Sequence, residues 1–143
     1  MRSDKFVFRH WAGRLLVGAA LFTVHCSLFT SCGRASKEEL ASLAAKGYYN
    51  HLIHGEYEQF LEGRFMADSL PEDYRSQLLD GYHQFINQQQ KARKGIREVR
   101  ISRAFTDTTQ NYTSVLLMLC YGDSTFEEVV VPMVERDGHW MMK

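Results

Sequence analysis

Residues 112–121 read Tyr-Thr-Ser-Val-Leu-Leu-Met-Leu-Cys-Tyr, and this run decides the fold. From Val115 to Cys120, apolar residues occupy both alternating positions. That pattern is typical of a central β-strand that is covered, at least in part, on both faces. Because a central strand needs a hydrogen-bonded neighbour on each side, we expect further strands before and after it in the sequence.

Strand patterns and turn residues do flank this run. The predicted strands and turns are, in order, 99–105, the turn 106–111, 112–121, the turn 122–124, 125–135, the turn Asp137-Gly138, and 139–143. Pro132 lacks a backbone N–H, so it marks a sheet edge or a bulge. The second half of the chain therefore predicts an antiparallel meander of about four strands.

Helical patterns precede the strands. Ser36 and Glu39 have capping-box spacing and open a helix whose apolar face recurs to Leu52. Gly55 interrupts this helix, and residues 56–62 form a second, short one. The order of helices and then strands predicts an α+β fold, with the N-terminal helices packed on one face of a curved antiparallel sheet.

A third helix is predicted from a second capping-box pair, Ser69 and Glu72, to a stop at Gly95. Residues at helical spacing are expected to form its buried face: Tyr74, Leu78, Tyr82, Phe85, Ile86 and Gln89. Basic residues in the last turn suit the negative end of the helix dipole.

The N-terminal residues are typical of a secretory signal. Four basic residues precede an apolar run over 15–29, and small residues follow before Cys32. The run is shorter than the ~20 apolar residues of a membrane span. A retained transmembrane anchor and an ordinary secreted protein cut elsewhere are the alternatives.

The stretch Phe29-Thr30-Ser31-Cys32 resembles the lipobox of bacterial lipoprotein precursors, with Phe29 where leucine is usual. The resemblance implies a lipoprotein signal peptide over residues 1–31 and a diacylglycerol on the thiol of Cys32. Its amine then accepts a further acyl chain such as palmitate, and two or more chains hold a protein stably at a membrane.

On this interpretation, residues 32–36 are a lipid-anchored tether and residues 37–143 are the folded domain. Gly33 stands where an aspartate favours retention at the inner membrane, so the expected location is the outer membrane of a Gram-negative bacterium. The expected partner at this end is the membrane itself, through the lipid on Cys32.

The charge balance and the number of cysteines argue against two classes of protein, nucleic-acid binders and disulfide-stabilised domains. The chain has 17 Lys and Arg and 17 Asp and Glu, and removal of residues 1–31 leaves a net charge of −3. This balance argues against a nucleic-acid partner. Three cysteines are too few for a disulfide framework, and Cys120 is expected to be a small buried hydrophobe.

The ending Asp137-Gly138-His139-Trp140 and the early stretch from Tyr48 to Phe60 resemble the nuclear-transport-factor-two-like or cystatin-like superfamily. The likeness covers roughly residues 37–143. It implies a helix-lined cone whose curved sheet can enclose a pocket, and a homodimer formed through the sheet. Fold alone does not give function, because such cones serve enzymes, ligand binders and interfaces alike.

Tyr48, Tyr82, His83 and Trp140 are the candidate ligand-binding residues. The resemblance implies that a histidine or an aspartate inside the cone, here His83 with Asp80, can act as a general base, while Tyr48 or Tyr82 donates to a developing oxyanion. However, His83 lies off the predicted apolar face of its helix. The many aromatic residues either line a ligand cavity or fill the core, and the core is the favoured interpretation.

Two further clusters of residues have both a functional and a simpler explanation. His51, His54 and Glu58 have the spacing of metal ligands on one helix face, but Gly55 breaks that helix, so no metal is expected. A basic cluster either meets an anionic headgroup or is simply solvated: Lys91, Arg93, Lys94, Arg97, Arg100 and Arg103.

Motifs for phosphate binding, nucleophilic catalysis and zinc proteolysis do not occur in the sequence. We therefore predict a non-enzymatic binding or interaction module of the cell envelope, without cofactor or catalytic residues. Its partner is an envelope protein. The alternative is a small-molecule carrier for a hydrophobic ligand, or a small enzyme, with a Tyr- and His-lined cone pocket.

Overall fold

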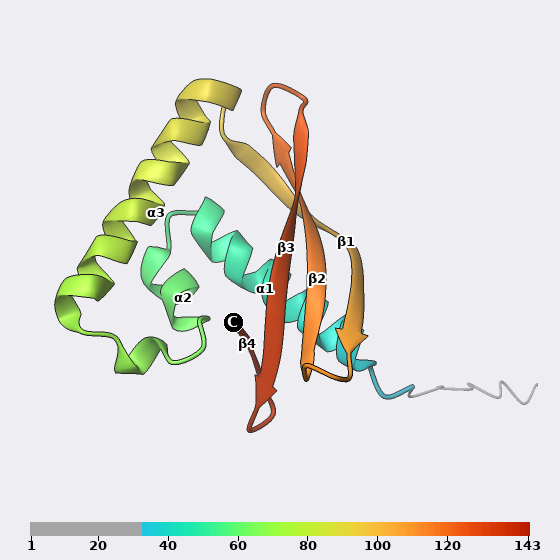
Figure 1. The fold of residues 1–143 in the computed structure, drawn as a ribbon. Coiled ribbons are helices and arrows are strands. Elements are labelled where there is room, and N and C mark those ends of the chain that lie inside the picture. The colour runs from blue at the N-terminus through green and yellow to red at the C-terminus, as the bar shows by residue number, and fades with distance from the viewer. Residues whose placement is uncertain (1–32) are drawn as a thin grey trace, which may run out of the picture. The chain divides into compact units, whose positions relative to one another are not determined.

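A computed structural model describes residues 33–143. The predicted signal peptide and Cys32 lie outside the described residues. The elements are α1 (Lys37–Ile53), α2 (Tyr57–Glu62), the 3-10 helix η1 (Ala67–Ser69), α3 (Glu72–Arg93), β1 (Ile96–Asp107), β2 (Tyr112–Tyr121), β3 (Phe126–Arg136) and β4 (His139–Met142). The strands form one antiparallel sheet in the order β1-β2-β3-β4, which confirms the predicted α+β meander (Figure 1).

Helix α1 begins where the capping-box spacing predicts. The hydroxyl oxygen of Ser36 accepts a hydrogen bond from the backbone N–H of Glu39 at 3.1 Å. Ala41 and Ala45, four residues apart, are fully buried in the core between the helix and the sheet. Their small side chains allow α1 to lie close against the sheet, which makes it the main helix of the core.

Helix α3 differs from its prediction in two ways. Ser69 belongs to η1 and caps nothing, and Pro71 is the residue that precedes the first turn. The expected buried face is also only partly correct: Leu78, Tyr82, Ile86 and Gln89 are half-buried, whereas Tyr74 and Phe85 are exposed and no residue of α3 is fully buried. The reason is that α3 stands away from the sheet and packs against α2 (Figure 1).

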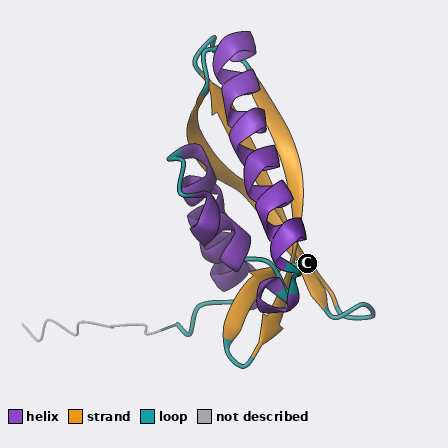
Figure 2. Ribbon diagram, turned by 90° about the vertical axis from the view of Figure 1, so that its left-hand side faces the viewer, coloured by secondary structure: helices purple, strands orange, loops and turns teal. Residues whose placement is uncertain are grey.

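The sheet has one covered and one open face, here called the inner and outer faces. The inner face packs on α1 and carries most of the core: Val99, Val115, Leu117, Leu119, Tyr121, Val131, Met133 and Met142. Figure 2 shows all helices on this side of the sheet. β2 is the central strand of the β1-β2-β3 ladder, as predicted, but within residues 33–143 the helices cover only one of its faces.

The last hairpin has the predicted turn, with Asp137 at φ 52° and Gly138 at φ 78°. Pro132 lies at a local edge, because the pairing of β3 with β4 begins only at Met133.

The free edge of β4 is closed by a loop. The N–H of Met142 donates to the carbonyl of Gly63 at 2.8 Å, and the N–H of Phe65 donates to Met142 at 2.7 Å.

Candidate binding surfaces

Tyr48 and Trp140, two of the four candidate ligand residues, are brought together by the fold. The hydroxyl of Tyr48 donates to the backbone carbonyl of Trp140 at 2.8 Å. Burial raises the pKa of the Tyr48 phenol, because the charged form is poorly solvated there. The Tyr48 ring also lies directly against the backbone of Gly63. Tyr48 therefore joins α1 to β4 and to the loop after α2.

Tyr82 does not join this pair. It packs against other aromatic side chains between the helices. Its ring meets Phe60 edge to face at 4.9 Å between centroids, and Phe60 meets Tyr49 in the same way at 5.4 Å. Arg64 donates to the Tyr82 hydroxyl over 3.4 Å. Three aromatic rings thus pack against one another between α1, α2 and α3, which favours the core interpretation of these residues.

His83 lies on the exposed part of α3. Its Nε2 is 3.2 Å from the side-chain amide of Asn87, and its ring contacts Tyr57 at 5.9 Å. Asp80 is also exposed. The structure therefore separates His83 from the Tyr48–Trp140 pair, and a base at this position faces solvent.

A polar cavity of about 250 Å³ adjoins Trp140, and its wall is mainly hydrophilic: Lys37, Thr106, Asn111, Tyr112, Thr113 and Glu135. Beside it the Thr106 hydroxyl donates to Glu38 and lies 3.0 Å from the Thr113 hydroxyl. The hydrogen bond from Thr106 holds the pKa of Glu38 below its ordinary value. Sequence patterns do not predict this group, because Glu38 and Thr106 are 68 positions apart.

His51 of α1 and His54, which directly follows this helix, have separate partners. His51 Nδ1 contacts the Glu56 carboxylate, and His54 Nδ1 lies 2.7 Å from the carbonyl of Asn50. Glu58 instead pairs with Arg75 of α3. Over residues 33–143 no three His, Cys, Asp or Glu side chains gather in a way that would hold a metal ion.

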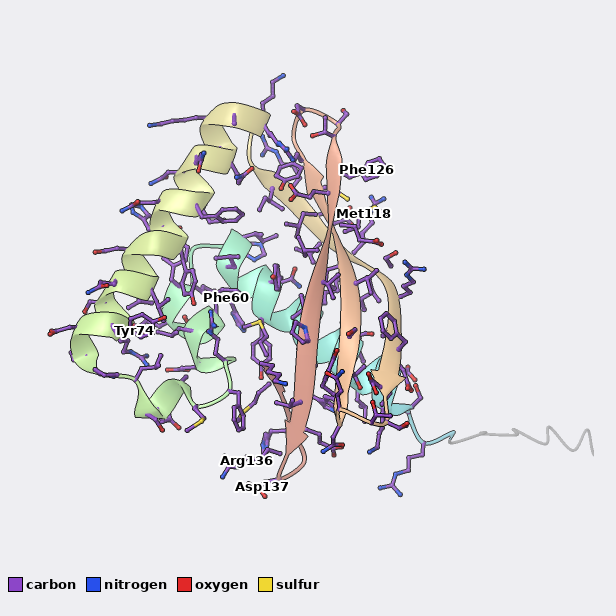
Figure 3. All side chains as sticks on the ribbon, in the orientation of Figure 1. Phe60, Tyr74, Met118, Phe126, Arg136 and Asp137 are labelled. Atoms are coloured by element: carbon purple, nitrogen blue, oxygen red, sulfur yellow. The ribbon has the colours of Figure 1, made fainter. Side chains whose placement is uncertain are left out.

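The outer face of the sheet was not predicted as a site. The β-register places its side chains in four rows across β1, β2 and β3: Glu98–Cys120–Phe126, Arg100–Met118–Glu128, Arg103–Leu116–Val130 and Phe105–Ser114–Pro132. Phe126, Val130 and Phe105 are 68%, 61% and 53% exposed. Figure 3 shows Met118 and Phe126 on the side away from α3.

This face combines apolar and charged residues. Leu116 is almost fully buried by its neighbours, while Cys120 is half-buried rather than buried as predicted, because no helix among residues 33–143 covers this face. At the β1 side Arg100 donates to Glu98 at 2.6 Å. That hydrogen bond lowers the pKa of Glu98 and raises that of Arg100. The apolar run of β2 is the sequence signal for this open face.

The basic cluster is divided among surfaces. Arg93 ends α3, with its guanidinium 4.5 Å from the Tyr121 ring centroid and 3.1 Å from Glu127. Arg100 and Arg103 belong instead to the outer face of β1. The cluster therefore does not form one continuous basic patch.

In the part of the chain from residue 33 onward, no helix has the length and apolar character needed to cross a bilayer. Comparison with protein-family models gives no match, and comparison with curated proteins gives none either.

One solved structure is similar, an NTF2-like protein from Campylobacter jejuni for which a transpeptidase activity has been inferred. It aligns with a TM-score of 0.56 over 68% of this chain and 92% of that chain, at 9% sequence identity. The described residues therefore share the fold of this NTF2-like protein, which is the fold that the sequence resemblance implied. At this identity the likeness establishes the fold and nothing of the activity.

Proposed function

We propose that this protein is a lipid-anchored, non-enzymatic interaction module of the bacterial cell envelope. Its anchor is the lipid on Cys32, and its binding surface is the outer face of the sheet. The domain then stays close to the outer membrane, because only residues 33–36 separate the anchor from α1. The outer face meets a protein partner.

The exposed apolar side chains of the outer face are the main support for this proposal. The outer face exposes Phe126 and Val130 of β3 beside Met118 of β2, whereas aromatic rings pack against one another on the helix side. Contiguous exposed apolar residues on a sheet typically mark a binding surface. A carrier of small hydrophobic ligands needs an open interior instead, and Tyr49, Phe60 and Tyr82 pack into that region.

The anchor is tested by labelling with an alkyne analogue of palmitate in a Gram-negative host. The full chain should take up the label and sediment with outer membranes. Cys32→Ser should remove both properties, while the control Cys26→Ser, six residues earlier, should keep both. Label that persists in Cys32→Ser, or an unlabelled full chain, contradicts the anchor.

The binding surface is tested with a photoreactive p-benzoylphenylalanine placed at Phe126 in the full chain. Irradiation of intact cells should join this position to a protein. The same probe at Tyr74, an exposed residue of α3 on the opposite side (Figure 3), is the matched control and should give far less adduct. Adducts with lipid alone, or equal adducts from both positions, contradict the proposal.

A further inference from the structure

Half of β3 has an open edge. β4 pairs with β3 only over residues 133–136, and Figure 1 shows β4 beside only the end of β3 that is nearest their hairpin. The N–H of Lys143 adds one further bond, to the carbonyl of Pro132 at 2.8 Å. Over residues 126–131, therefore, β3 has a neighbouring strand on the β2 side alone in the described part of the chain.

The register identifies the backbone groups on this open edge. Because Lys143 bonds to Pro132, every second residue of β3 counted from Pro132 directs its N–H and C=O away from β2. On the open edge these residues are Phe126, Glu128 and Val130. No strand among residues 33–143 pairs with their backbone groups, because β4 ends before it reaches them. Such a row of free donors and acceptors is a template for one more extended strand.

A cavity of about 130 Å³ lies next to the open edge. Its wall includes Val131 and Pro132 of β3, Met142 of β4, and Tyr49, Phe60 and Arg64 from the helix side. Val131 is buried on the inner face, and directly opposite residues of paired strands point to the same face. An added strand therefore directs the side chain opposite Val131 towards this cavity, which has room for one side chain of medium size.

Charges of opposite sign lie at the two ends of the open edge. Arg64, at the cavity, forms no ion pair with any residue from 33 to 143, and its nearest polar contact is the Tyr82 hydroxyl at 3.4 Å. Glu128 likewise has no cationic partner within that range, and its side chain is exposed on the outer face. An acidic side chain fits the cavity, and a basic one fits beside Glu128.

We infer that the open edge of β3 binds an extended segment of another protein as an added antiparallel strand in line with β4. This inference rests on the proposed function and states how its protein partner is held. The segment has an acidic residue opposite Val131 and, three positions later, a basic residue opposite Glu128. The two residues between them are apolar, because they lie opposite Val129 and Val130.

A second copy of this chain is a poorer occupant of the edge. Two open edges paired about a two-fold axis bring Glu127 and Glu128 of both copies into one short stretch of sheet. Neighbouring like charges across paired strands are destabilising. A lipid surface offers no backbone groups at the spacing of a strand, so it cannot satisfy this edge.

Two substitutions at Val130 separate edge pairing from contact with the outer face. Val130→Pro removes the N–H on the open edge and keeps an apolar side chain; it leaves the bonds to β2 intact, because Val130 directs its N–H away from β2 as Pro132 directs its imide nitrogen. Val130→Ala keeps the N–H and removes most of the side chain.

The measurement is the yield of protein adduct from the photoreactive residue at Phe126 in the full chain. Val130→Pro should lower the yield by about tenfold or more, since a hydrogen bond is lost and the proline ring obstructs the incoming strand. Val130→Ala should lower it less. If Val130→Ala weakens the adduct more than Val130→Pro does, the partner uses outer-face side chains and the inference is overturned, while the proposed function stands.

Arg64→Glu tests the cavity without changing the strand. It should also lower the adduct yield by about tenfold or more, because an acidic side chain of the partner then meets a like charge. Lys91→Glu, on the exposed surface of α3, makes the same change of charge and should leave the yield unchanged. Equal yields from the two variants overturn the inference. Circular dichroism checks that each variant is folded.

The sequence of the joined peptide reads the partner directly. Mass spectrometry should find in it an acidic residue followed three positions later by lysine or arginine. A joined peptide without this pattern, or one that comes from a second copy of this chain, overturns the inference and leaves the interaction module intact. No protein adduct from the unchanged chain contradicts the proposed function and the inference together.

Discussion

The ring of Tyr48 lies so close to Gly63 that a Cβ atom at position 63 would be 2.3 Å from the ring's Cδ1 atom. Gly63 ends α2 with φ −70°, a backbone conformation that any residue adopts. The glycine is therefore required by close packing and not by backbone freedom. This contact, with the hydrogen bond from Tyr48 to Trp140, holds three distant segments of the domain together.

Gly63→Ala should lower the free energy of unfolding by about 1–3 kcal/mol, because the tyrosine ring must move to admit a methyl group. Urea unfolding followed by tryptophan fluorescence measures the change. Gly47→Ala is the matched control in α1, where an added Cβ meets nothing within 4 Å. It should stabilise the helix by about 0.5–1 kcal/mol. Equal effects of the two substitutions contradict the packing argument.

Tyr48→Phe should cost about 0.5–1.5 kcal/mol, since it removes the hydrogen bond to the Trp140 carbonyl and keeps the ring against Gly63. The same unfolding experiment measures it. Tyr74→Phe removes a hydroxyl from an exposed residue and should change little. If Tyr48→Phe is as harmless as the control, the hydrogen bond contributes nothing to stability.

Phe60→Ala should be the most damaging of these substitutions, at about 3–5 kcal/mol, because Phe60 is 7% exposed and contacts both Tyr49 and Tyr82. Tyr82 links α3 to the rest of the domain through that ring. Hydrogen exchange should therefore show loss of protection in α3 before the sheet. Uniform loss over all elements indicates that α3 does not depend on this contact.

The domain should lose stability in alkaline solution. Burial raises the pKa of Tyr48, Tyr49 and Tyr121, so the folded state holds these protons more tightly than the unfolded state, where tyrosine titrates near pH 10. The stability is fully present below about pH 10 and falls as the pH rises through the folded-state pKa.

Urea midpoints at neutral and at strongly alkaline pH measure this loss. Tyr49→Phe should retain its midpoint at neutral pH and lose less on the alkaline side, because one buried phenol no longer titrates. Lysine deprotonation affects both proteins equally and cancels in the comparison. An identical alkaline loss in the two proteins contradicts the role of Tyr49.

Much of the fold follows from local patterns. Ser36 with Glu39, the Asp137-Gly138 turn and the alternation along β1 to β3 act over a few residues, so they predict where α1 and the strands lie. The start of α3 shows where prediction from local sequence patterns fails. Ser69 and Glu72 have the right spacing for a cap, but the chain turns through η1 before Pro71, and no local rule separates the two outcomes.

The candidate site depended on contacts between distant segments. Tyr48, Tyr82, His83 and Trp140 are all suitable residue types, yet only Tyr48 and Trp140 meet, because α3 stands away from the sheet and turns His83 towards solvent. The pair Glu38 and Thr106 is likewise formed only when α1 crosses β1.

The sequence by itself determined the order of helices and strands, the central place of β2 and its apolar character on both faces, since backbone hydrogen bonding and side-chain alternation are local properties. Only the tertiary structure decided which face the helices cover. That choice depends on where Ala41 and Ala45 let α1 approach the sheet, and it leaves Met118, Phe126 and Val130 open.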